Sequence, residues 1–281
     1  MIGRTLVALS IISAAYTTSG AQSYPGLAFD ETVRESRALN TSADTGSAVM
    51  HFLTSRGNLR VDVEGPIPDA PNLPTGKGRS VMLLTDSGNK VTFINVDEKQ
   101  YISINPNAMI ESVKKMMEAV GGQIVIDTAA TKLNLDSLGP GPSVDGHPIL
   151  RYRLTTSFRM TMAMMGNSST MEQQSVEEIQ AAADLVDLVD VNTSVNRLAD
   201  MGQTMGMSPE FMERAKAMQK KIRGFPIRVT KVQTVKAEGR TRTSSQDITV
   251  SNIKRLQVPD SAFAIPAGYT PLAIPKLPAV D

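Results

Sequence analysis

The chain has 281 residues and no cysteine, which excludes disulfide bonds, thiolate zinc sites and a cysteine nucleophile. Its 29 basic and 28 acidic side chains nearly balance, so the net charge gives no support to nucleic acid as a partner. A chain of this length can bury a core without disulfide bonds.

The first 21 residues have the three-part organisation of a secretory signal peptide. Arg4 supplies a positive charge, residues 5–15 form an apolar run, and small residues occupy positions 19–21. The apolar run is shorter than the roughly 20 residues of a membrane-spanning helix. We therefore expect cleavage between Ala21 and Gln22, and a mature chain that lies in the periplasm or is secreted, without a transmembrane segment. No cysteine is available at this site to carry a lipid anchor.

Short strands with turn sequences between them follow a polar lead over residues 22–44. The segment 86–89 (DSGN) and the pair Asp145-Gly146 are typical hairpin turns. A long strand rich in threonine is predicted over residues 147–165, and a last hairpin over 225–236 and 240–253. The strands predicted between these turns make an antiparallel sheet, and the first of them cover residues 50–53, 59–63, 81–84, 91–96 and 100–104.

Two helices are predicted from capping residues and apolar spacing. Asn105 is a suitable N-cap before Pro106, and Gly121 ends the apolar period that follows. A second helix is predicted from Ser208 to Ile222. Residues 170–202 fit either a strand or a helix, and we favour a strand to about residue 183 with a helix near 192–202. Strands and helices together predict the α+β fold class.

Two stretches of this chain resemble a family of secreted bacterial proteins of unknown function. They are residues 135–139 (LDSLG), which lead to Gly146-His147, and residues 258–269 (VPDSAFAIPAGY). That family is similar to the LolA/LppX-type lipoprotein carriers, whose fold is a half-open β-barrel. The resemblance implies a single LolA-like α+β domain over residues 45–272, in which a large curved antiparallel sheet has helices packed on its concave side. A tail then covers residues 273–281.

The sequence contains no catalytic motif that we recognise. It has neither the G-x-S-x-G pattern of a hydrolase nor a P-loop. Its two histidines, His51 and His147, lie beside predicted turns, where they are interpreted as surface or edge residues. A zinc site needs three or four ligands. We therefore predict a protein that is not an enzyme and that has no cofactor and no metal site.

Methionine is the unusual feature of the composition, with 16 residues. Three of them occupy alternate positions near the end of the predicted strand 147–165, and others form a stripe on the helix that begins at Asn105. The stripe suits ordinary core packing, an adaptable apolar cavity for lipid chains or a thioether site for Cu(I). The ligand-cavity candidates are Met109, Val113, Met116, Met117, Met160, Met162 and Met164.

Charge is distributed unevenly along the chain. Residues 172–200 contain seven acidic side chains against Arg197, whereas residues 214–255 contain twelve basic side chains against two acidic ones. These segments form two solvated faces, or else a basic face that meets anionic lipid or an acidic partner.

The function predicted from these features is that of a non-catalytic exported protein that binds a lipid or a lipoprotein in a concave apolar cavity. Two alternatives stay open. One is a structural or protein–protein interaction module of the cell envelope, and the other is a methionine-based copper-binding protein.

Overall fold

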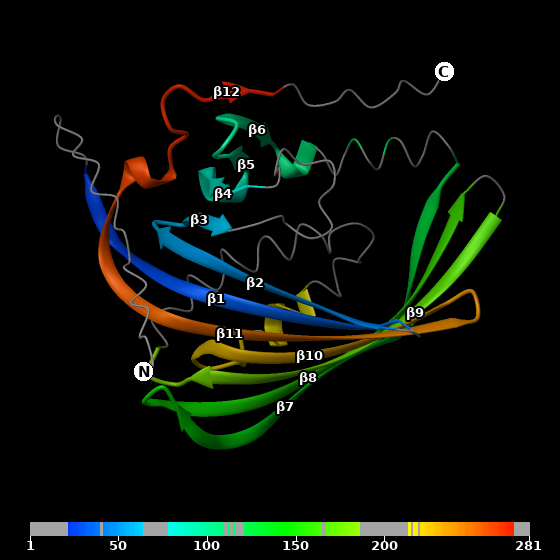
Figure 1. Ribbon diagram of the computed structural model, residues 1–281. Coiled ribbons are helices and arrows are strands. Elements are labelled where there is room, and N and C mark those ends of the chain that lie inside the picture. The colour runs from blue at the N-terminus through cyan, green and yellow to red at the C-terminus, as the bar shows by residue number, and fades with distance from the viewer. Residues whose placement is uncertain are drawn as a thin grey trace.

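The described strands of the computed structural model join into one twelve-stranded sheet (Figure 1). In the sheet the order is β12-β6-β5-β4-β3-β2-β1-β11-β10-β9-β8-β7. The strands are β1 (Ser23–Leu39), β2 (Ser42–Ser55), β3 (Asn58–Val63), β4 (Ser80–Thr85), β5 (Lys90–Asn95), β6 (Gln100–Ile104), β7 (Gln123–Val144), β8 (His147–Met164), β9 (Asn167–Ala182), β10 (Phe225–Ala237), β11 (Arg240–Pro259) and β12 (Thr270–Pro271).

The structure describes part of the chain. The predicted signal peptide, the predicted helix near 192–202 and the tail over 273–281 lie outside that part. The described residues are 22–39, 42–63, 78–108, 112, 115, 121–164, 167–185, 213, 214, 216–218 and 220–272.

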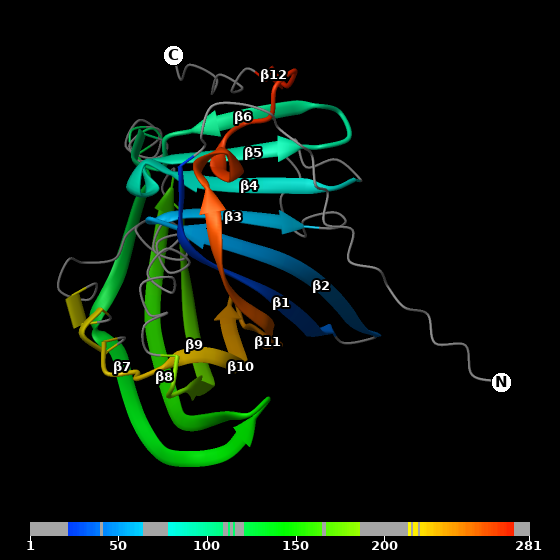
Figure 2. The ribbon, with the colours of Figure 1, turned by 90° about the vertical axis from the view of Figure 1, so that its left-hand side faces the viewer.

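Two antiparallel meanders share this sheet. Strands β1 to β6 form one meander and β7 to β11 the other, and β1 joins them by pairing with β11. The only parallel pair among the described strands is β12 with β6. Short strands β3–β6 lie at one end of the sheet, and the long strands β7–β9 curve away at the other, so the sheet curls (Figures 1 and 2).

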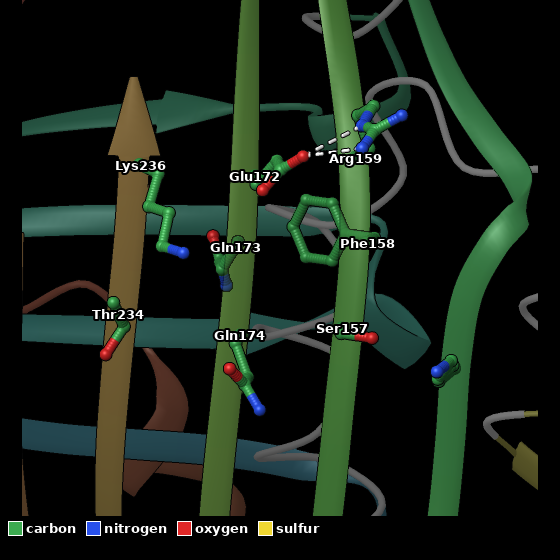
Figure 3. Close-up of a pocket in the computed structure, with 9 residues that line it drawn as sticks. Ser157, Phe158, Arg159, Glu172, Gln173, Gln174, Thr234 and Lys236 are labelled. Carbon is green, nitrogen blue, oxygen red and sulfur yellow. Dashed lines mark hydrogen bonds and ion pairs between the residues drawn. The ribbon is translucent and has the colours of Figure 1, made fainter. Parts of the chain in front are cut away.

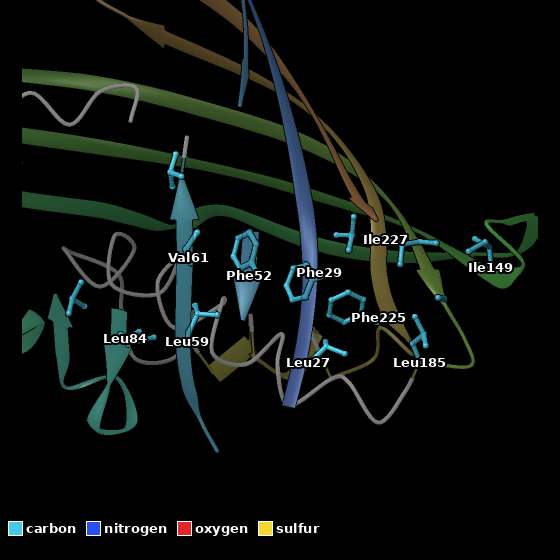
Figure 4. Close-up of a cluster of buried hydrophobic side chains, with 14 residues drawn as sticks. Leu27, Phe29, Phe52, Leu59, Val61, Leu84, Ile149, Leu185, Phe225 and Ile227 are labelled. Atoms are coloured by element: carbon cyan, nitrogen blue, oxygen red, sulfur yellow. The ribbon is translucent and has the colours of Figure 1, made fainter. Parts of the chain in front are cut away.

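The largest apolar cluster lies on the inside of this curl (Figure 4). It joins side chains from strands that are far apart in the sheet order, such as Val91 of β5 and Val250 of β11. Only the inner face of a curled sheet can bring such strands together. Phe29 is central to the cluster, because its ring stacks on Phe52 at 4.8 Å and meets the edge of Phe225 at 5.5 Å.

A second, smaller cluster covers the outer face of the short strands. Val81, Leu83 and Ile94 are buried there beneath Ile265 and Tyr269 of the segment that follows β11. This segment begins with the short 3-10 helix η3 (Asp260–Phe263). The residues 258–269 that carry the family resemblance therefore cover the outer face of β4 and β5. Because both faces of these strands are buried, their sequences are nearly continuously apolar.

The α+β prediction is wrong. Strands make up 73% of the structure and helical residues 9%, in two short helices, so the described chain is one large open sheet without helices packed on a concave side. The predicted cap at Asn105 is confirmed, since its Oδ1 accepts a hydrogen bond from the backbone N–H of Ala108 at 3.1 Å. None of the described helices is long and apolar enough to cross a membrane.

The sheet is larger than predicted because two segments outside the predicted strands belong to it. The polar lead forms β1 and the start of β2, and the segment 139–142 (GPGP) lies within β7. The strand favoured up to about residue 183 is confirmed as β9. Strand β7 tolerates glycine and proline because it is an edge strand with register shifts, including one between Ser137 and Gly139. On β1 and β9, glutamate and glutamine at inner positions hide the alternation that normally reveals a strand.

Candidate functional site: the inner wall of the long strands

Strand β8 separates an apolar inner face from a charged outer face. It pairs with β9 without a register shift, so its even-numbered residues share one face. The register continues that face from Tyr152 through Ile179, Val229 and Ile248 to Val33 of β1, which is on the side of Phe29. We call the inner face of β1, β11, β10, β9, β8 and β7 the inner wall.

Four polar side chains cross the inner wall in one row, here called the polar belt. The belt runs over four adjacent strands as Glu35, Gln246, Lys231 and Glu177, each directly opposite the next. The amide of Gln246 donates to Glu35 at 3.3 Å, and Lys231 Nζ lies 3.1 Å from Glu177 Oε1. Half-buried ion pairs and hydrogen bonds inside an apolar surface give fixed points for a polar group of a ligand.

Glu31 is a further acid on the inner wall, nearer the core. Its cross-strand neighbours on this face are Met50 and Val250, which are both apolar. Burial raises the pKa of Glu31 from its ordinary value of 4.5 to about 7. Within the described residues no cation pairs with it, so its charged form is the costly one.

Beyond the polar belt, the inner wall ends in an apolar group that we call the distal patch: Phe158, Met160, Met162, Met171 and Ile126. On the sheet, Met160 lies opposite Met171 of β9 and opposite Ile126 of β7. The side chains are half-buried, except that of Met162, which is exposed. Thioether side chains make this patch soft enough to adapt to ligands of different shape.

Two of the seven candidates proposed from sequence lie in this patch, Met160 and Met162. Met164 is at the end of β8, and its side chain is outside the described residues. The helical candidates Met109, Val113, Met116 and Met117 also lie outside the described residues. Sequence reasoning missed Met171 and Ile126. The two-residue connection between β8 and β9 was the available signal for Met171, because it places residue 171 opposite residue 160.

Comparison with known proteins adds no family. Neither a protein-family model nor a curated protein matches this chain. The resemblance to LolA/LppX-type carriers therefore stays a prediction from the sequence, and the site is interpreted from its own residues.

The outer face of the same strands has a shallow pocket of about 340 Å³ (Figure 3). Arg159 crosses it and donates to Glu172 at 2.6 Å, which raises the pKa of the guanidinium. The hydroxyl groups of Ser157 and Thr234 line the pocket without a histidine or cysteine among the described lining residues.

Each histidine pairs with one aspartate. His51 Nδ1 lies 2.6 Å from Asp30 Oδ1, and His147 Nδ1 lies 2.9 Å from Asp184 Oδ2. The hydrogen bond from His147 lowers the pKa of Asp184. In the part of the chain that the structure describes, no three histidine, cysteine or acidic residues converge as metal ligands.

Proposed function

We propose that this protein is exported and binds an amphiphile with long acyl chains on its inner wall. The observation that carries the proposal is the contrast between the two faces at the distal end of the long strands. The inner face presents the distal patch, whereas the outer face at the same level carries Arg159, Glu172 and Lys236. A sheet face that is exposed to solvent and binds no ligand is expected to be polar, as the outer face is here.

The energetics suit an acyl chain. Each buried methylene group contributes about 0.8 kcal/mol, so a chain that buries roughly ten of them gains about 8 kcal/mol, enough to offset much of the cost of association. Binding of this kind needs no reactive group. The polar belt then acts on the headgroup, because Lys231 and Glu177 provide a donor and an acceptor within an apolar surface. Affinity comes from the chain, and orientation from the belt.

The proposal is tested with the full chain in a titration of a fluorescent long-chain fatty acid. Met160→Glu should weaken binding at least about tenfold, which corresponds to 1.4 kcal/mol, because it places a charge in the path of the acyl chain. The matched control is Thr161→Glu, the next residue of β8, which faces outward. The control should bind like the native chain.

Circular dichroism and thermal melting establish that both variants fold. Equal affinities for the two variants, or no binding by the native chain, would contradict the proposal. A parallel titration with Cu(I) tests the thioether alternative, since a copper site at Met160 should be lost in Met160→Leu, whereas an acyl-chain site should survive that change.

A further inference from the structure

The ends of five strands, β7 to β11, lie together at the far end of the inner wall, in a region that we call the hairpin end: residues 123–132, 157–164, 167–172 and 234–243. Ala237 of β10 lies opposite Met171 of β9, and Met171 lies opposite Met160 of β8. Arg240 pairs with Ala237 across the two-residue turn Glu238-Gly239. Both turn residues have positive φ, 51° and 72°, which gives a tight turn that fixes the position of Arg240.

The hairpin end has an excess of positive charge. It contains five basic residues, Lys132, Arg159, Lys236, Arg240 and Arg242, against the three acidic residues Asp127, Glu172 and Glu238. All five basic side chains are exposed. Arg240 and Arg242 lie on the inner face beside the distal patch, whereas Lys236 and Arg159 lie on the outer face.

Exposed apolar side chains are concentrated in the same place. Five large apolar side chains in the described chain are exposed, and two of them lie in the hairpin end. These are Val125 at 48% and Met162 at 42% exposure. Apolar side chains that stay in water among basic ones are characteristic of surfaces that bind a partner.

The positions of these residues favour a membrane over an acidic protein. Met162 lies on the inner face, whereas Val125, opposite Thr161, lies on the outer face with Arg159. One protein surface would have to contact both faces of the sheet at once. A bilayer interface accepts the end of the sheet edge-on, with apolar side chains among the acyl chains and arginines at the level of the phosphates.

We propose that the hairpin end docks edge-on onto an anionic lipid surface. This docking is separate from the binding of a single amphiphile by the inner wall. It uses the ends of the strands, where the exposed apolar side chains enter the bilayer while the basic side chains are attracted by the anionic lipid. Each arginine brought near an anionic surface strengthens binding about fivefold at low ionic strength.

Co-sedimentation of the full chain with vesicles tests the docking. We expect tighter binding to vesicles of mixed phosphatidylglycerol and phosphatidylcholine than to phosphatidylcholine alone, and weaker binding as salt is raised. The double variant Lys132→Glu/Lys236→Glu changes two exposed basic residues on the outer face of the hairpin end and should lose about tenfold or more in vesicle affinity. Its affinity for the fluorescent fatty acid should be unchanged, which separates this proposal from the function of the inner wall.

The matched control reverses the same number of charges on β10 and β11 away from the hairpin end. Arg228→Glu/Lys254→Glu changes two exposed basic residues there and should bind vesicles like the native chain. Equal losses in the two double variants would overturn the proposal, as would indifference of the native chain to anionic lipid. If the native chain instead retains an acidic protein in an envelope pull-down through the hairpin end while vesicles do not bind, the hairpin end is a protein interface and the proposal is wrong.

Discussion

Replacing Phe29 by alanine is expected to lower the free energy of unfolding by about 3–5 kcal/mol. Phe29 is 3% exposed and contacts the rings of both Phe52 and Phe225, so three of the seven phenylalanines of the chain meet at this point. They come from β1, β2 and β10. The loss therefore combines the transfer energy of a large side chain with a cavity between strands of the two meanders, whose described strands pair only through β1 and β11.

Denaturation by urea, followed by circular dichroism, measures this loss. The control is Val49→Ala, since Val49 is an exposed apolar residue on β2, next to Met50 and on the outer face. It should cost less than about 1 kcal/mol, the usual range for an exposed strand position. A Phe29→Ala variant that unfolds no more easily than Val49→Ala would show that the aromatic group does not join the meanders.

Glu31→Gln is expected to stabilise the protein at neutral and alkaline pH but not in acid. The folded chain raises the pKa of Glu31 to about 7, from 4.5, because the carboxyl group is partly buried. The proton is thus held more tightly in the folded state than in the unfolded state. The contribution of Glu31 is most favourable below pH 4.5 and falls as the pH rises through 7, by up to about 3 kcal/mol.

The difference in unfolding free energy between Glu31→Gln and the native chain isolates this effect, because the other titrating groups cancel. It should be flat below pH 4.5, rise in favour of the variant to about pH 7, and then level off. Thr32→Val, on the opposite face of β1, changes no titrating group and should give no such rise. A constant difference for Glu31→Gln from pH 4 to pH 8 would mean that the charge of Glu31 is not penalised by the inner wall.

A pH dependence at Glu31 would also bear on the ligand. Its neighbours on the inner face, Met50 and Val250, offer no charge to compensate a carboxylate. Along the same face of β1, the next ionisable residue is Glu35 of the polar belt, four positions further on and beyond Val33. A ligand that covered Glu31 without pairing with it would raise its cost further, so acyl chains should bind here more tightly at lower pH.

Turn chemistry was readable from the sequence because it depends on a few adjacent residues. Asp145-Gly146 forms the predicted turn between β7 and β8, with both residues at positive φ, and the last hairpin turns at Glu238-Gly239. Asn105 caps a helix for the same reason, since a side chain three residues away satisfies a backbone N–H. Likewise, the alternate spacing of Met160 and Met162 was enough to place them on one face of a strand.

The pairing of distant segments was not readable in this way. No local signal indicates that residues 23–39 pair with residues 243–259, although this pairing of β1 with β11 joins the two meanders. The polar belt depends on it, because Glu35 and Gln246 are 211 positions apart. The sequence by itself determined turns, one cap and the periodicity of single strands. The tertiary structure alone decided which strands are neighbours and which face is inside, because burial acts on the sum of many side chains across the whole sheet.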